Sequence, residues 1–243
     1  MKPFIPEMIF FDYGGTLMDE GRFDEVAAAR AILSCADNPR AASEETVLAL
    51  WREANALIGR RTHADAIGLE IPLTPTLRGV MARAGLKTSL SPLEIEIAFH
   101  RQNAFHKPMP FVSEMLSLLR EKNVRTAVIS NITLSGDALR LAISDCIPNH
   151  SFEFVITSAD YVFCKPSPLL FDAALKKAGV APERCWYCGN DFSADVVGAV
   201  SSGMFPVLLD LSSETAISMD IFEKSEFVRV NSWNALISLL QRL

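Results

Sequence analysis

Four short segments of the sequence carry carboxylate, hydroxyl, amide and amine side chains that could do chemistry. In the first, Asp12-Tyr-Gly-Gly-Thr16, an aspartate follows four apolar residues and leads into a glycine pair. The other three contain Ser130 with Asn131, Lys165 before a proline, and Asn190, Asp191 and Asp195 in the run GNDFSAD. Each is weak alone, because such residues after a strand are most often turn or cap residues. Their order along the chain favours a common site.

Asp12 and Lys165 suit the transfer of a phosphoryl group. A carboxylate can accept that group as an aspartyl-phosphate, and a lysine beside it could neutralise both the carboxylate and the phosphate. Backbone N–H groups at Gly14 and Gly15 could converge on the phosphate oxygens. Further donors follow the second apolar run: the Ser130 hydroxyl and the N–H of Asn131.

A hard cation would help to hold an anionic substrate against an anionic nucleophile. Mg²⁺ suits this role, because it binds a few protein oxygens and keeps water and substrate oxygens as its other ligands. The candidate oxygens belong to Asp12, Asn190, Asp191 and Asp195. The sequence therefore predicts Mg²⁺ as the cofactor.

The elements that must position these residues follow from the hydrophobic pattern. Short apolar runs bounded by turn residues predict strands at 8–13, 124–131, 154–158, 185–190, 205–210 and, more weakly, 226–231. Helical periodicity predicts helices at 111–122, 135–143, 167–178, 193–202 and 233–243. This alternation predicts an α/β fold with a doubly wound parallel sheet. The four segments then lie at or beyond strand ends, where open α/β sheets bind ligands.

The interval 19–107 interrupts the alternation. It shows only helical periodicity, at 26–34, 44–58, 76–84 and 92–105, and it is far longer than a strand-to-helix connection needs. We expect a catalytic core of residues 1–18 and 108–243, with 19–107 inserted as a helical cap domain over the sheet edge and Pro108 and Pro110 at the return hinge. Several residues of the insert are interpreted as structural. The helical spacing of Leu50, Trp51 and Leu57 indicates a core of the cap. Arg60, Arg61 and His63 fall near a predicted loop, and His100 and His106 lack the third ligand that a metal site needs.

Composition limits the classes of partner. A net charge of −6 without a long basic run argues against a nucleic-acid surface, whereas a small phosphorylated or acidic metabolite remains compatible. No apolar stretch reaches ~18 residues and the N-terminus lacks a signal-peptide pattern. We expect a cytoplasmic monomer or homodimer without membrane contact, its five cysteines reduced. In CWYC, at 185–188, strand geometry should point Cys185 and Cys188 to opposite faces.

The chain resembles the haloacid dehalogenase superfamily of hydrolases, in the subgroup whose helical cap follows the first motif. The resemblance covers residues 8–19 and roughly 108–210, including the segments MPFVSEMLSLLREKNVRTAVISN and GNDFSADVVGAVSSGM; the insert carries no diagnostic match. It implies a Rossmann-like core with Asp12 as nucleophile, Ser130 binding the transferred group and Lys165 holding the charges. It also implies substrate contacts from Tyr13, Gly14, Gly15, Thr16 and Asn131. The implied metal region comprises Asp12, the Gly14 carbonyl, Asn190, Asp191 and Asp195.

Two positions depart from the family pattern. Phosphatases of the family carry an acid two residues after the nucleophile, which protonates the leaving oxygen and then activates water; here that residue is Gly14. The first acid of the last motif is replaced by Asn190, with Asp191 beside it. Since general acid–base help contributes ~10²–10⁴-fold, we expect activity mainly on phosphates with good leaving groups. Asp19 or Glu20 could reach the site when the cap closes.

Three alternatives remain open from the sequence. The small residue at position 14 and the Ser130-Asn131 pair also fit a dehalogenase, in which Asp12 displaces halide without a metal. A phosphonate-cleaving enzyme would need a cap lysine, and Lys87 is the only lysine between Lys2 and Lys107. Gly14 and Asn190 also motivate a module that binds a phosphorylated ligand without turnover.

Overall fold

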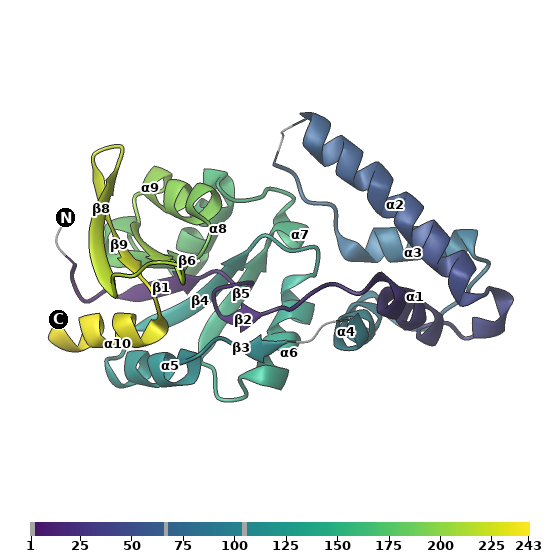
Figure 1. Cartoon of the computed structure of the whole chain (residues 1–243), viewed down its shortest axis with the longest axis horizontal. Coiled ribbons are helices and arrows are strands. Elements are labelled where there is room, and N and C mark those ends of the chain that lie inside the picture. The colour runs from purple at the N-terminus through teal and green to yellow at the C-terminus, as the bar shows by residue number, and fades with distance from the viewer. Residues whose placement is uncertain (1–2, 66–67, 104–105) are drawn as a thin grey trace.

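The computed structural model describes residues 3–65, 68–103 and 106–243. A seven-stranded sheet in the order β5-β4-β1-β6-β7-β9-β8 forms its centre (Figure 1). The strands are β1 Met8–Phe11, β4 Arg125–Ser130, β5 Phe152–Thr157, β6 Cys185–Gly189, β7 Phe205–Leu209, β8 Ile217–Phe222 and β9 Ser225–Val230. The pairs from β5 to β9 are parallel, and β8 adds antiparallel to β9. The predicted parallel α/β sheet is confirmed; β8 is an additional edge strand, half exposed and without a clear sequence signal.

Helices cover both faces of the sheet (Figure 1). One face carries α5 Val112–Glu121, α6 Gly136–Cys146 and α10 Trp233–Arg242, and the other carries α8 Pro168–Ala178 and α9 Val197–Ser201. Successive strand side chains point to opposite faces, so Ile9 and Phe11 pack in the first layer and Met8 and Phe10 in the second. All five cysteines are free, and Cys185 and Cys188 lie in opposite layers as predicted.

Within its described residues, the predicted insert holds four α-helices: α1 Glu25–Ser34, α2 Glu44–Asp65, α3 Leu73–Arg83 and α4 Pro92–Asn103. The chain enters and leaves through a two-stranded antiparallel ribbon, β2 Met18–Asp19 with β3 Lys107–Pro108. Because α2 continues to Asp65, the prediction that 60, 61 and 63 lie near a loop is wrong; their side chains lie outside the described residues. Trp51 is buried between Phe23 and Phe99, as expected of cap core, but Leu57 is 53% exposed and that assignment is wrong.

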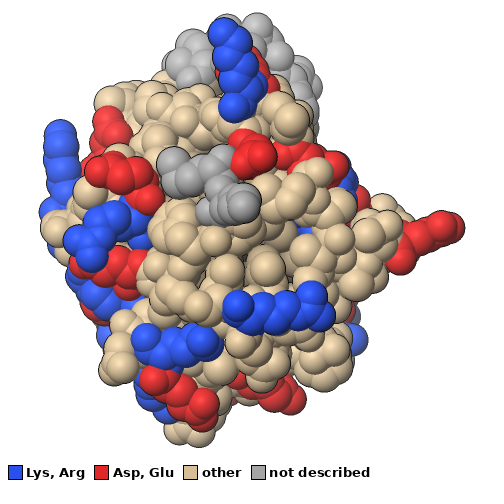
Figure 2. Space-filling model, turned by 90° about the vertical axis from the view of Figure 1, so that its left-hand side faces the viewer, with Lys and Arg blue, Asp and Glu red and all other residues tan. Residues whose placement is uncertain are grey.

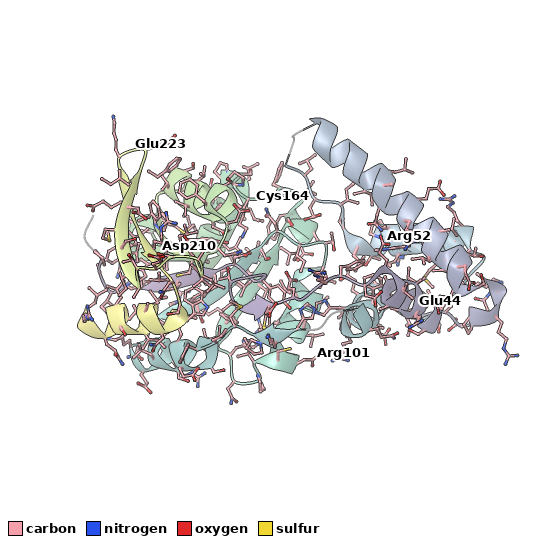
Figure 3. All side chains as sticks on the ribbon, in the orientation of Figure 1. Glu44, Arg52, Arg101, Cys164, Asp210 and Glu223 are labelled. Atoms are coloured by element: carbon pink, nitrogen blue, oxygen red, sulfur yellow. The ribbon has the colours of Figure 1, made fainter. Side chains whose placement is uncertain are left out.

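A seam joins the insert to the sheet-bearing part, mainly where α4 meets α6. The buried carboxylate of Glu96 accepts hydrogen bonds from the backbone N–H of Ser135, at 3.1 Å, and from the Thr74 hydroxyl, at 2.6 Å. Nearer the surface Arg101 (labelled in Figure 3) forms a two-bond ion pair with Asp145 at 2.9 and 3.1 Å. These bonds fix the helical insert against the edge that carries the strand ends.

The surface shows mixed charge on the end of the molecule remote from the insert. Figure 2 views that end, and lysine and arginine side chains lie interspersed with acidic ones across it. Among the described residues, no helix is both long and apolar enough to cross a membrane. Other short elements are α7 Ser158–Tyr161, two 3₁₀ turns, Pro39–Ala41 and Pro182–Arg184, and a π-helical turn, Phe192–Val196.

Candidate active site

Three adjacent strands bring the chemical segments together. Asp12 follows β1, Ser130 ends β4, and Asn190 follows β6, and β1 pairs with both of the other strands. These residues line a pocket of about 240 Å³ together with Lys165, Asp191 and Asp195. We call it the Asp12 pocket. The structure thus places residues from all four predicted segments around one cavity at the carboxyl end of the sheet.

Lys165 is the centre of a buried charge cluster. Its Nζ donates to Asp12 Oδ1 at 2.7 Å, to Asp195 Oδ1 at 2.7 Å and to Tyr187 Oη at 2.8 Å. Burial alone would lower its pKa, but the two carboxylates outweigh that effect and raise it. Lys165 is therefore a fixed cation that holds one oxygen of Asp12 and leaves the other free of this bond. We call Asp12, Lys165, Tyr187 and Asp195 the strand-end cluster.

Asn131 fixes the backbone of Lys165 from the neighbouring loop. Its Oδ1 accepts from the backbone N–H of Lys165 at 2.7 Å, and its Nδ2 donates to the Lys165 carbonyl at 3.0 Å. Cys164, labelled in Figure 3, precedes the lysine in a segment between the sheet and the insert. The side chain of Asn131 thus positions the lysine, and its backbone N–H, the group expected to bind substrate, takes no part in these two bonds.

A π-helical turn, Phe192–Val196, holds the last acidic segment. The Asp191 Oδ1 caps this turn by accepting from the N–H groups of Ser193, at 2.7 Å, and Ala194, at 3.0 Å. The Asp195 Oδ2 accepts from the Asp191 N–H at 2.9 Å, while its Oδ1 binds Lys165. Burial and the nearby Asp12 raise the pKa of Asp195 against the effect of the lysine. Both oxygens of Asp195 thus have protein partners, which fits a lysine-orienting residue better than a metal ligand.

Gly15 and Thr16 lie behind the Asp12 pocket. The N–H of Gly15 donates to the carbonyl of Met18 at 2.8 Å, so it is used within the turn and does not face an anion as expected. Gly15 has a φ of +69°, and a Cβ there would lie 2.7 Å from the Asn190 amide. The buried Thr16 hydroxyl donates to Asn190 Oδ1 at 3.0 Å. These two residues shape the turn and orient Asn190.

Glu20 fills the space left by the missing side chain at position 14. An ideal Cβ on Gly14 would lie 2.1 Å from Glu20 Oε2 and 3.0 Å from its Cδ. The residue is exposed along part of its length, but burial of the carboxylate and the nearby Asp12 raise its pKa. Glu20 also lines the Asp12 pocket. A carboxylate therefore stands at the place where the sequence has none.

A second cavity, of about 300 Å³, lies at the seam and contains Glu20, His100, His106 and Thr133 in its wall. The two histidine rings stack with centroids 4.2 Å apart, and burial and His106 lower the pKa of His100 to about 4. Tyr13, which was expected to bind substrate, is fully buried with its ring 6.1 Å from that of His106. Within the described part of the chain, the Tyr13 hydroxyl and both ring nitrogens of His106 have no hydrogen-bond partner. We call Tyr13, Glu20, His100 and His106 the seam cluster.

The donor set around Asp12 suits a hard cation in part. The Asp12 pocket is lined by four carboxylates, from Asp12, Glu20, Asp191 and Asp195, against one lysine, an excess of negative charge that a divalent cation would offset. Among the described residues, no group of three or more His, Cys, Asp or Glu side chains could hold a metal by itself. The oxygens that remain open, on Asp12, Asp191 and the Gly14 carbonyl, would need water and phosphate oxygens to complete the shell.

Comparison with known proteins agrees with this architecture. Residues 6–203 match the family model described as haloacid dehalogenase-like hydrolase. A glyceraldehyde 3-phosphate phosphatase from Methanothermobacter thermautotrophicus is 31% identical over 227 residues, covering 89% of this chain and 91% of that protein. One from Methanopyrus kandleri is 28% identical over 211 residues, 82% of each chain. The solved 2-haloacid dehalogenase from Pseudomonas syringae pv. Tomato DC3000 shares the fold, with a TM-score of 0.63 at 20% identity over 98% of this chain and 99% of that one.

The sequence did not predict the positions of two residues of the site, Tyr187 and Glu20. Tyr187 accepts from Lys165 and donates to the Ile129 carbonyl at 2.9 Å, but it lies within a strand whose apolar pattern indicates only core. Strand alternation could have placed it on a face opposite Cys188. Glu20 was expected only as an alternative to Asp19, because nothing in the local sequence shows that a turn returns it to Gly14.

Proposed function

This chain belongs to the haloacid dehalogenase-like hydrolases, and from that premise we propose that it is a phosphatase that hydrolyses a small phosphorylated metabolite through an aspartyl-phosphate on Asp12. The chain is a hydrolase, and the two relatives described above are named glyceraldehyde 3-phosphate phosphatases. The observation that carries the proposal is the buried Lys165, held at 2.7 Å from both Asp12 and Asp195. Such a fixed cation beside a nucleophilic carboxylate suits phosphate better than a neutral substrate.

The proposed reaction proceeds in two displacements. The Asp12 oxygen that does not bind Lys165 attacks phosphorus as the bond to the leaving oxygen breaks. Water then attacks the phosphorus of the aspartyl-phosphate, releasing inorganic phosphate and restoring Asp12. Lys165 and the Ser130 hydroxyl, which also lines the pocket, would hold the phosphoryl oxygens in both steps.

We further propose that the site takes Mg²⁺. Asp12, the Gly14 carbonyl and the uncapped oxygen of Asp191 would hold the ion, with Asn190 beside them. When bound, the ion would offset negative charge on the phosphate and on the carboxylates. Asp195 is removed from the proposed ligands because Lys165 and the Asp191 N–H occupy its oxygens.

The helical insert is proposed to act as the cap domain, with residues 19–107 as its extent and 1–18 and 108–243 as the core. The seam cavity lies between α4 and the loop after β4, so a leaving group would contact both parts. We propose a small phosphate ester as substrate, with glyceraldehyde 3-phosphate the first compound to test, and a cytoplasmic location.

The test is phosphate release from glyceraldehyde 3-phosphate, glycerol 3-phosphate and p-nitrophenyl phosphate, with Mg²⁺ present or chelated. We expect activity that chelation abolishes, and an acid-stable phosphoenzyme that is lost in Asp12→Asn. Asp172→Asn, which changes an exposed aspartate on α8, is the matched control and should behave as the wild type. Activity that survives Asp12→Asn unchanged would contradict the proposal.

The alternatives have separate signatures in the same experiment. Chloride release from 2-chloropropionate that is insensitive to chelation would indicate a dehalogenase. Retention of the phosphorylated compounds without turnover, measured by calorimetry, would indicate a binding module. The dehalogenase result is not expected, because two named relatives are phosphatases and four carboxylates line the Asp12 pocket, where a metal would offset them. The binding-module result is not expected, because a charge cluster that leaves one Asp12 oxygen free of the lysine suits a nucleophile.

A further inference from the structure

Position 14 raises the question of how the leaving oxygen receives its proton. Gly14 has no side chain, yet an alkoxide is a poor leaving group without an acid. We infer that Glu20 is this acid, and that it acts from the space that the glycine leaves open. The inference rests on the proposed phosphatase function. It assigns the proton transfer that Gly14 cannot perform to the residue that directly follows β2.

The backbone at position 14 does not itself require glycine; the space beside it is filled by the side chain of Glu20. The φ of Gly14 lies outside the left-handed region, so other residue types could adopt its backbone conformation. A Cβ at this position would instead lie 2.1 Å from Glu20 Oε2, far inside a contact distance. Glycine at 14 and glutamate at 20 are therefore a matched pair, in which the first makes room for the second.

A tight turn brings the two residues together. The carbonyl of Tyr13 accepts from the N–H groups of Leu17 and Met18 at 2.9 and 3.0 Å, and the N–H of Gly15 donates to the Met18 carbonyl at 2.8 Å. The chain thus reverses directly after the nucleophile, and β2 returns beside the start of the turn. Glu20, which follows β2, reaches back along this return path.

Asp19, the other acid of this segment, is directed elsewhere. Its Oδ1 accepts from the Gly21 N–H at 3.2 Å and its Oδ2 lies 3.3 Å from the Lys107 Nζ. Glu20 forms no ion pair within the described part of the chain. Adjacent residues of an extended segment point to opposite sides, so fixing Asp19 on Lys107 directs Glu20 into the site. Of these two neighbouring carboxylates, Asp19 contacts Lys107 and Glu20 lines the Asp12 pocket.

Glu20 also lies at the boundary that a proton donor must occupy. Its side chain lines both the Asp12 pocket, where the phosphoryl group would bind, and the seam cavity with His100 and His106, where the rest of the substrate would extend. The bond that breaks joins these two parts of the substrate. A carboxyl group at their junction can reach the leaving oxygen.

The proton transfers balance over the two steps. In the first, the Glu20 carboxyl gives its proton to the leaving oxygen while the bond from Asp12 to phosphorus forms and the ester bond breaks, releasing an alcohol. In the second, the Glu20 carboxylate accepts a proton from the water that attacks phosphorus, as the bond to Asp12 breaks. Glu20 is then protonated again and inorganic phosphate leaves.

The test separates the leaving group from the rest of the reaction. In Glu20→Gln, the first-turnover rate on glycerol 3-phosphate should fall about 10²–10⁴-fold, whereas the p-nitrophenol burst from p-nitrophenyl phosphate, which needs no acid, should fall less than about tenfold. The phosphoenzyme should then accumulate, because the base for the second step is also missing. Glu121→Gln, the same change at an exposed glutamate of α5, is the matched control and should show neither effect.

A residue swap provides the second arm. Gly14→Asp alone should reduce activity, since its side chain overlaps that of Glu20. The double variant, Gly14→Asp with Glu20→Ala, should be at least about tenfold more active on glycerol 3-phosphate than Glu20→Ala alone. The reason is that a general acid is worth about 10²–10⁴-fold in rate. Melting temperatures show whether each variant is folded.

The outcomes distinguish this inference from the proposed function. A wild type that is inactive on both substrates, or insensitive to Asp12→Asn, contradicts the phosphatase proposal itself. An active wild type whose Glu20→Gln variant slows equally on both substrates, or on neither, overturns the role of Glu20 alone. Gain of activity in the Gly14→Asp single variant would overturn it as well.

Discussion

At the strand-end cluster each charged group has a partner within 2.8 Å, whereas at the seam cluster the Tyr13 hydroxyl and the His106 nitrogens have none among the described residues. Buried polar groups are normally hydrogen-bonded, so a group left without a partner calls for an explanation. The two clusters adjoin each other, because Glu20 lines both the Asp12 pocket and the seam cavity. The contrast indicates that the phosphoryl end is organised before substrate binds, while the seam cluster holds buried polar atoms that no described protein group satisfies.

The largest expected effect is the loss of the cation in the strand-end cluster. Lys165→Met leaves the Asp12 and Asp195 carboxylates buried without their shared partner, which should cost about 3–5 kcal/mol of unfolding free energy. It should also reduce kcat/KM by more than about 10³-fold through lost charge stabilisation. Urea unfolding and phosphate release measure the two effects.

Lys176→Met is the matched control, because Lys176 is exposed on α8. We expect its stability to lie within about 0.5 kcal/mol of the wild type. If Lys165→Met were as stable as this control, the strand-end cluster would not be the tightly coupled charge group that its geometry indicates.

A smaller effect should appear in the seam cluster as acid sensitivity. Burial and His106 lower the pKa of His100 to about 4 from its ordinary 6.5. Because the unfolded chain then binds the proton more tightly than the folded protein, stability is lost as pH falls from 6.5 towards 4. At pH 5 this loss should be about 2 kcal/mol.

His100→Gln should remove that part of the pH dependence. Between pH 8 and pH 5, the unfolding free energy of the wild type, measured in urea, should therefore fall by about 2 kcal/mol more than that of the variant. Asp145 and Arg101 also act on His100, with opposite effects on its pKa, and both remain in the variant. Parallel pH curves for the two proteins would mean that His100 is not held neutral by its surroundings.

The same contrast explains what could be predicted from the sequence. In the strand-end cluster, Asp12 follows from an apolar run that ends at a carboxylate, because parallel strands bring their carboxyl ends to one edge, whereas Tyr187 was not predicted. Lys165 was placed by its order along the chain. The seam cluster follows from no such rule, since residues 13, 20, 100 and 106 meet only through the turn after β1 and the packing of α4.

Local sequence also left some backbone details unresolved. Gly15 was expected to offer its N–H to an anion, but the turn uses that group for the Met18 carbonyl. The end of α2 was placed too early, at 58 instead of Asp65, because the segment GRRTHAD has no apolar stripe.

The smallest expected effect on stability, and the sharpest test of the contrast, comes from His106→Phe. The ring nitrogens of His106 have no partner within the described chain, so an apolar ring of similar shape should be neutral or stabilise the protein by up to about 1 kcal/mol. If those nitrogens serve the leaving group, KM for a sugar phosphate should rise while the burst with p-nitrophenyl phosphate changes little.

His150→Phe is the matched control for this substitution, because both nitrogens of His150 are engaged. Its Nε2 lies 2.9 Å from the Ser144 hydroxyl and its Nδ1 accepts from the Phe152 N–H at 3.2 Å. Removing those bonds should cost about 1–2 kcal/mol and leave KM unchanged. Equal destabilisation by the two variants would show that His106 is a structural residue, and the seam cluster would then lose its distinction from the strand-end cluster.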